Sequence, residues 1–226
     1  MPRVLITAAL LMEARAIARA FGLKGRFNAR VEMDDAGEIG VALVGPRGKY
    51  IDEARALGTR DGKLQGIVMA GVAGALSPEL KVGDVVIQGD LRDHGLLMKE
   101  GVRMGRIVTS RDIVGTPAEK TRLFKETGAL AVDMETEVAQ EVARQMGVNF
   151  LALRAISDAA ADSLDPELLK LVDAEGKPRI SRAALHVARH PGKLRGLLNI
   201  RAASERALSS LTAVLLDVMA SGWPAA

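Results

Sequence analysis

Charged side chains stand at the ends of two apolar strand-like runs in this 226-residue sequence. Glu135 follows the run that begins at Ala131, and Arg154 and Asp158 lie at the end of the run 149–156. A further carboxylate, Glu13, interrupts the apolar run at 1–12. Open α/β sheets bind ligands at the carboxyl ends of their strands, so residues at the two strand ends can converge on one site, where carboxylates can donate or accept protons. The pattern therefore predicts a ligand site that contains Glu135, Arg154 and Asp158.

Each of these residues also has a structural alternative. Glu13 can be a carboxylate in the first turn of a helix, where the helix dipole favours negative charge. Arg154 can serve as an ion-pair partner of Glu135, a role that is compatible with a place in the site. Asp158 can cap a helix, because Ser and Asp are both favoured at that position.

Small residues dominate positions 68–76, which read Val-Met-Ala-Gly-Val-Ala-Gly-Ala-Leu, and Lys-Val-Gly-Asp-Val-Val follows at 81–86. We expect a buried strand at 66–71, so that Ala73 and Gly74 come directly after it. Without bulky side chains, a ligand can approach the backbone closely at this point. Tight packing between a strand and a helix explains the same composition equally well.

Segments typical of strands and helices alternate along the chain. The expected strands are 3–9, 26–33, 38–45, 66–71, 84–88, 107–109, 130–133 and 149–156, and the expected helices are 11–21, 50–59, 117–126 and 134–146. Beyond position 163 we expect a helix at 164–172 and two further helices separated by Pro191-Gly192. This order predicts one α/β domain over residues 1–226, with 163–226 as its helical, basic C-terminal extension.

The composition excludes several classes of protein. Hydrophobic residues make up 48% and charged residues 26%, which is typical of a folded globular protein. No cysteine is present, so we expect no disulfide or thiolate metal site and a cytoplasmic location. His186 and His190 have a zinc-compatible spacing but lack the neighbouring Glu of metalloproteases, so we expect no metal. No apolar run reaches the ~18 residues of a membrane span.

Positive charge is concentrated at 177–206, which holds eight Lys or Arg and one Glu. Leucines and an isoleucine alternate with these cations, a pattern that predicts an amphipathic basic helix. Such a helix can lie on an anionic membrane surface, although packing of one face on the domain is the commoner explanation. Aromatic residues are only 3% of the chain, which leaves almost no stacking surface for nucleic acid, so we expect no such partner.

Three of these motifs, taken in order, resemble a known superfamily. Ala-Gly-Val-Ala-Gly-Ala-Leu with Lys-Val-Gly-Asp-Val-Val, then Val-Asp-Met-Glu, then Arg-Ala-Ile-Ser-Asp are similar to the nucleoside phosphorylases and nucleosidases. The resemblance covers most of residues 3–162. It implies a mixed central sheet flanked by helices, no cofactor, and homo-oligomers. The C-terminal part looks more like the hopanoid-associated branch, whose presumed substrate is adenosylhopane.

The resemblance also implies roles for individual residues. Asp158, with Ser157 beside it, would protonate N7 of a departing adenine. Glu135 would hold the ribose hydroxyls and stabilise positive charge on the sugar, while Met134 packs against the ring. Glu13 and Arg154 would flank the nucleophile.

Several details of the expected site are left open by the sequence. In the family, the residue that stacks on adenine comes just after the strand that here ends near Ser110, so Ile113 or Val114 would contact the adenine. No Phe occupies this place, so the contact would be aliphatic. Val72 stands where the nucleosidases usually carry Ser, so either water or phosphate can be the nucleophile. Phosphate would bind to the turn that contains the following residues: Gly45, Arg47 and Gly48. The alternative is that this segment is an ordinary turn whose two cations, Arg47 and Lys49, are exposed to solvent.

The connection from Gly89 to Arg106 is shorter than in the nucleosidases, which suggests an open 5′ side and a bulky substrate. The resemblance to the hopanoid-associated branch implies adenosylhopane as the preferred substrate, a lipid-linked nucleoside that fits a peripheral contact with the inner membrane through 177–206. The alternative enzyme is a methylthioadenosine/adenosylhomocysteine nucleosidase. The alternative of a different class is a protein that binds a nucleoside without cleaving it.

Overall fold

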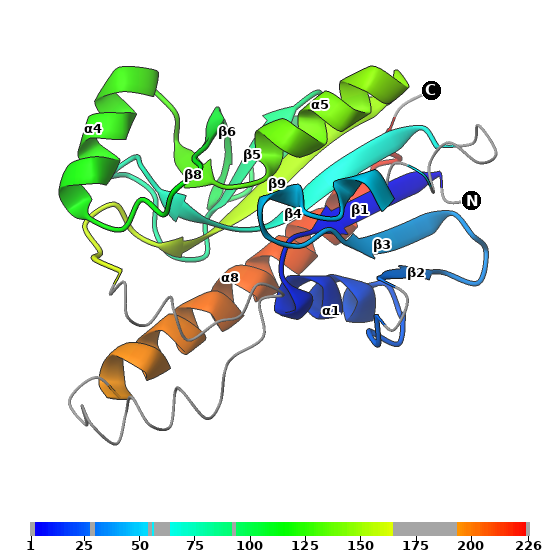
Figure 1. The fold of residues 1–226 in the computed structure, drawn as a ribbon, viewed down its shortest axis with the longest axis horizontal. Coiled ribbons are helices and arrows are strands. Elements are labelled where there is room, and N and C mark those ends of the chain that lie inside the picture. The colour runs from blue at the N-terminus through cyan, green and yellow to red at the C-terminus, as the bar shows by residue number, and fades with distance from the viewer. Residues whose placement is uncertain are drawn as a thin grey trace.

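A computed structural model describes residues 3–27, 30–53, 56, 64–91, 94–164 and 194–224. In these residues nine strands form one sheet, in the order β2-β3-β1-β4-β9-β5-β6, with β8 pairing β4 and β7 (Figure 1). The strands are β1 (Val4–Ala8), β2 (Val31–Met33), β3 (Ile39–Leu43), β4 (Gly66–Ala75), β5 (Val85–Gly89), β6 (Val102–Met104), β7 (Ile107–Thr109), β8 (Ala131–Asp133) and β9 (Asn149–Asp158). Neighbours among β3, β1, β4 and β9 are parallel, whereas β5 runs antiparallel to β9, so the expected mixed sheet is confirmed.

Helices cover both faces of the sheet (Figure 1). In the described residues they are α1 (Leu11–Ala20), the 3-10 turn η1 (Pro46–Gly48), α3 (His94–Leu97), α4 (Pro117–Thr127), α5 (Thr136–Met146) and α8 (Leu194–Ala220). Helices α1 and α8 pack on one face, where Ile17 and Leu211 belong to the core, and α5 packs on the other, where Ala139 does. Alternate residues of β9 divide between the two cores, as expected of a strand buried on both faces. The predicted α/β architecture is therefore confirmed.

Most predicted elements lie where the sequence placed them. Helix α1 ends at Ala20 and is followed by Gly22 in the left-handed region (φ 74°), while α4 begins at Pro117 after the capping residue Thr116. The last predicted helix corresponds to α8. The helix expected at 164–172, the first of the two C-terminal helices, and half of 50–59 fall outside the described residues. None of the helices in the described part of the chain is long and apolar enough to cross a bilayer.

Two strand boundaries expected in the N-terminal half of the chain were wrong. The strand expected at 26–33 is only Val31–Met33, because the Glu32 carboxylate accepts hydrogen bonds from the amides of Gly25, Arg26 and Phe27 and folds that segment back. Strand β4 does not end at Gly71 but continues to Ala75. Its small residues lie inside the strand, since β9 and β8 both hydrogen-bond to this stretch.

The predicted start of α5 was also early. Met134 and Glu135 precede the helix, which begins at Thr136. The Asp133 carboxylate accepts hydrogen bonds from the Thr136 amide at 3.1 and 3.2 Å, which caps the first turn. Met134 and Glu135 therefore lie in the short connection between β8 and α5, outside the regular helix.

Candidate active site

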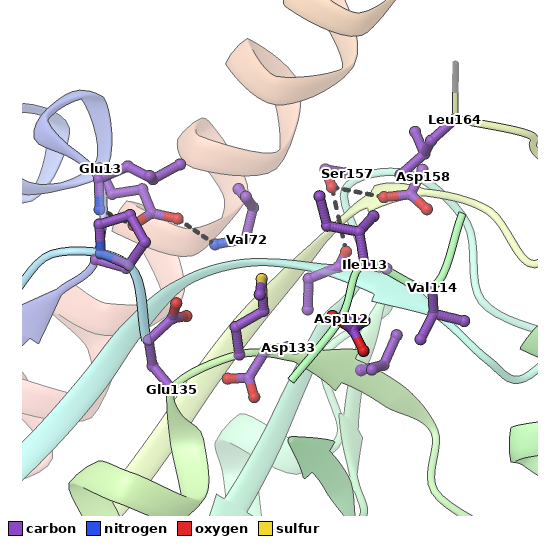
Figure 2. Close-up of a pocket in the computed structure, with 17 residues that line it drawn as sticks. Glu13, Val72, Asp112, Ile113, Val114, Asp133, Glu135, Ser157, Asp158 and Leu164 are labelled. Atoms are coloured by element: carbon purple, nitrogen blue, oxygen red, sulfur yellow. Dashed lines mark hydrogen bonds between the residues drawn. The ribbon is translucent and has the colours of Figure 1, made fainter. Parts of the chain in front are cut away.

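A pocket opens at the carboxyl ends of β1, β4 and β9, the edge where the sequence predicted a ligand site. Its cavity volume is about 210 Å³. The lining residues are Ala9, Leu10, Glu13, Pro46, Val72, Ala73, Gly74, Asp112, Ile113, Val114, Val132, Asp133, Met134, Glu135, Ser157, Asp158 and Leu164. Figure 2 shows Glu13 and Glu135 at one end of the pocket and Ser157 and Asp158 at the other.

Glu13 is buried at the first turn of α1, with an exposed fraction of 2%. One carboxylate oxygen accepts a hydrogen bond from the Leu10 amide at 2.8 Å, and the other accepts one from the Val72 amide at 2.9 Å. Glu13 therefore does lie in the first turn of a helix, as its structural alternative expected, and it also lines the pocket. Burial raises the pKa of Glu13 to about 7, although the positive charge of Arg154 acts against this rise.

Gly71 makes room for the charged pair above β4. A Cβ atom at this position would lie 2.7 Å from Oε1 of Glu13 and closer still to Nη1 of Arg154. Real Cβ atoms essentially never approach other atoms this closely, so only glycine allows both side chains to occupy their present positions.

Replacing Gly71 with alanine is expected to lower the free energy of unfolding by about 1–3 kcal/mol, because the added methyl group overpacks a buried site. Gly115→Ala is the matched control, since a Cβ there meets only ordinary contacts at 3.5 Å or more. Chemical denaturation of both variants checks this. Equal stability of the two variants would contradict the steric role of Gly71.

Arg154 is fully buried in β9 and is surrounded by acidic groups. Its Nη2 lies 2.5 Å from Asp133 and 3.4 Å from Glu135, and its Nε donates to Thr136 Oγ1 at 3.3 Å. Burial alone would lower the pKa of Arg154, but the carboxylates, Asp133 first among them, raise it above its usual value. The sequence suggested Glu135 as the partner, whereas the closer partner is Asp133. Nη1 of Arg154 has no hydrogen-bond partner in the described part of the chain.

Glu135 joins this arginine to the turn formed by η1. Burial raises the pKa of the Glu135 carboxyl, although Arg154 lowers it. One carboxylate oxygen accepts a hydrogen bond from the Arg47 amide at 2.8 Å. Gly45, Arg47 and Gly48 all have positive φ, at 74°, 57° and 66°. The turn predicted to hold phosphate thus already directs one backbone amide to a carboxylate.

The opposite end of the pocket depends on an irregularity in β9. The register with β4 shifts between Ala73 and Gly74, which pair with Ile156 and Asp158 and leave Ser157 as the extra residue of a β-bulge. An unbroken strand would send two successive side chains to opposite faces. The bulge instead lets both Ser157 and Asp158 line the pocket.

Asp158 is buried and accepts two side-chain hydrogen bonds. Ser157 Oγ donates to Oδ1 at 2.9 Å, and Nζ of Lys120 donates to Oδ2 at 2.5 Å. No helix follows Asp158 through residue 164, so the alternative that it caps a helix was wrong. Gly74 lies next to this carboxylate, where a Cβ would be 3.1 Å from Oδ2.

The walls between the two ends are mainly apolar. Ala73, Ile113, Val114 and Met134 line the pocket as the sequence predicted, and Ile113 remains 50% exposed at its rim. Sequence reasoning missed the role of Lys120, which belongs to no motif and whose position on α4 gave no sign of burial. Within the described ranges, no group of three or more His, Asp or Glu side chains is placed to share a metal ion.

Comparisons with known proteins find similar sequences and similar folds. The model of the phosphorylase superfamily matches residues 89–189. Futalosine hydrolase from Streptomyces coelicolor is 29% identical over 222 residues, which cover 77% of this chain and 94% of that protein.

Among solved structures, futalosine hydrolase of Helicobacter pylori superposes with a TM-score of 0.66 at 19% identity, covering 97% of this chain and 98% of that one. The 5′-methylthioadenosine/S-adenosylhomocysteine nucleosidase of the same organism superposes with a TM-score of 0.65 at 19% identity, covering 98% and 99%. At this identity the structural matches show the fold. The family model and the sequence relative show that this chain is similar to members of the nucleoside phosphorylase and nucleosidase superfamily.

Proposed function

We propose that the protein cleaves the N-glycosidic bond of an adenine nucleoside and releases adenine. The observation that carries this proposal is the placement of Glu13 and Glu135 at one end of a pocket and Asp158 at the other (Figure 2). This spacing lets a nucleoside lie with its ribose beside Glu13 and Glu135 and its base beside Asp158. The family of relatives and the nucleosidase names among them support the same class of reaction.

Cleavage of the N-glycosidic bond requires stabilisation of both the departing base and the sugar. When the bond between ribose C1′ and the base nitrogen breaks, its electron pair goes to the base and positive charge develops on the sugar. Asp158 delivers a proton to N7 and neutralises the base, a contribution of ~10²–10⁴-fold for general acid catalysis. Glu135 stabilises the cationic sugar and holds its hydroxyls, while Met134, Ile113 and Val114 contact the ring systems. Ala73, Gly74 and Ser157 border the base.

The charges at the ribose end favour water over phosphate as the nucleophile. Glu13, Asp133 and Glu135 surround a single arginine, Arg154, whose Nη2 is already paired with Asp133. A phosphate anion would meet more negative than positive charge there. Water carries no such penalty, and Glu13, with a pKa of about 7, can accept its proton near neutral pH. The unpaired Nη1 of Arg154 can donate to the water oxygen.

We further propose that the nucleoside substrate carries a bulky substituent at its 5′ position. The pocket adjoins a second hollow that shares Asp112 and Met134 and is also lined by Arg47 and Val138. This extra space supports a bulky 5′ group, for which adenosylhopane remains the preferred candidate. The methylthioadenosine/adenosylhomocysteine nucleosidase activity named for several structural neighbours is the second candidate.

A lipid-linked substrate suits a peripheral membrane contact through 177–206, most of which lies outside the described residues. Leu198 and Ile200, at the start of α8, are 55% and 38% exposed, which supports such a contact. Nearby, Nε of Arg201 forms an ion pair with Oε1 of Glu205 at 2.8 Å. Assembly into homo-oligomers also remains a proposal.

Measuring free adenine from adenosylhopane, methylthioadenosine and adenosylhomocysteine, with and without phosphate, tests the proposal. We expect release that is independent of phosphate and fastest with adenosylhopane. Dependence on phosphate would contradict water as the nucleophile, and a preference for methylthioadenosine would favour the second candidate. Binding of these nucleosides without release of adenine would show a non-catalytic nucleoside-binding protein instead.

A further inference from the structure

Lys120 is a buried cation that the proposed reaction does not yet use. It lies in α4, outside every motif of the superfamily resemblance, and its side chain has an exposed fraction of 0%. Lysines are almost never fully buried without a partner, because removing an ammonium group from water is costly. Such a group therefore requires an explanation in terms of what it contacts.

All three hydrogens of the Lys120 ammonium have acceptors at the base end of the pocket. Nζ donates to Oδ2 of Asp158 at 2.5 Å, to the Ala159 carbonyl at 2.8 Å and to the Asp162 carbonyl at 3.1 Å. One side chain thus binds the carboxylate itself and two points of the chain that follows it. The same segment is also held close to the start of α4, where the Leu164 amide donates to the Gly115 carbonyl at 2.8 Å.

These contacts leave Asp158 little freedom. Ser157 Oγ occupies Oδ1, and Lys120 occupies Oδ2, so rotation of the carboxylate would break two hydrogen bonds. The ammonium is also the only cation within ion-pair distance of Asp158 in the part of the chain that the structure describes. Its contribution is electrostatic as well as geometric, because charge-assisted hydrogen bonds are roughly twice as strong as neutral ones.

We propose that Lys120 is a positioning residue for the release of the base and acts through Asp158. This inference rests on the proposed nucleoside cleavage. As the C1′–base bond breaks, its electron pair enters the base, and a proton passes from the Asp158 carboxyl group to N7. The ammonium at Oδ2 stabilises the carboxylate that remains, so the contact strengthens as the base leaves. Interactions that strengthen in the transition state raise kcat and leave KM nearly unchanged.

The first test replaces Lys120 with methionine, which preserves much of the volume and removes the charge. With an adenine nucleoside that the wild type cleaves, we expect kcat to fall ~10²-fold and KM to change less than ~3-fold. Lys120→Gln, which keeps hydrogen-bond donors without the charge, provides a second variant if the methionine protein does not fold. The matched control is Lys125→Met, since Lys125 lies on the same helix and is exposed.

A double substitution separates action through Asp158 from a general structural role. If Lys120 acts through Asp158, adding the Lys120 substitution to Asp158→Asn is expected to lower kcat by less than ~3-fold further. Losses that multiply would overturn the inference. With 4-nitrophenyl riboside, whose leaving group departs without a proton, we expect the Lys120 variants to be impaired far less than with the adenine nucleoside. Equal impairment with the two substrates would also overturn it.

Failure of the inference and failure of the proposed function give different results. A wild-type protein that releases no adenine from any of the nucleosides would contradict the proposed function itself. An active wild type whose folded Lys120 variants keep its kcat would contradict the role of Lys120 alone. Thermal unfolding of each variant identifies the proteins that are folded and can be compared.

Discussion

Asp158→Asn is expected to lower kcat for adenine release by ~10²–10⁴-fold, the range that general acid catalysis contributes. Asparagine has nearly the same shape and can still accept a hydrogen bond from Lys120, but it has no acidic proton to transfer. KM should change little, because the interaction that is lost develops as the base leaves. Single-turnover measurement of adenine formation at saturating substrate checks this expectation directly.

The matched control for this variant is Asp162→Asn, which removes the same charge four residues further along. Asp162 accepts a hydrogen bond from the Ala159 amide at 2.8 Å but does not line the pocket. We expect near wild-type kcat for the control and similar thermal unfolding for both proteins. If Asp158→Asn kept full activity with adenine nucleosides, Asp158 would not be the leaving-group acid.

Glu13→Gln is expected to produce a loss of similar size, ~10²–10⁴-fold, because glutamine cannot accept a proton from water. The wild-type profile of kcat/KM should rise with pH through about 7, the pKa of Glu13. A general base is active only when it is deprotonated, so activity is lost as the pH falls below the pKa of Glu13. The Glu13→Gln variant should lack this rise of kcat/KM with pH. A wild-type profile that stays flat from pH 5 to 8 would contradict the assignment of Glu13 as the base.

The Glu13 carboxyl group also predicts how the free energy of unfolding changes with pH. The pKa of Glu13 is raised on folding, from 4.5 to about 7, so its contribution to stability is complete below pH 4.5 and is lost as pH rises through 7. Relative to wild type, Glu13→Gln should therefore gain stability between pH 5 and pH 8, by at most about 3 kcal/mol. The control is Glu126→Gln, an exposed site on α4. Chemical denaturation at the two pH values measures the difference.

Local sequence was sufficient for most of the fold. The apolar pattern of β1, the cap and proline that begin α4, and the glycine that follows α1 all act over a few residues, so they can be recognised in the chain alone. Errors arose where distant segments decide the outcome. Strand β4 extends to Ala75 because β8 and β9 supply hydrogen bonds to it, and the segment before β2 bends because of Glu32.

The resemblance to the superfamily pointed to Glu13, whereas the sequence pattern by itself determined the class of fold, the edge of the sheet that holds the pocket, and the carboxylates Glu135 and Asp158 that line it. These follow from patterns within single elements and from the rule that parallel strands share a carboxyl edge. Only the tertiary structure decided that Asp133 is the closest partner of Arg154, that a bulge presents Ser157 and Asp158 together, and that Lys120 is buried against Asp158. The physical reason is that each contact joins residues 21 or more positions apart or depends on the pairing of two strands, so packing creates it and local sequence does not record it.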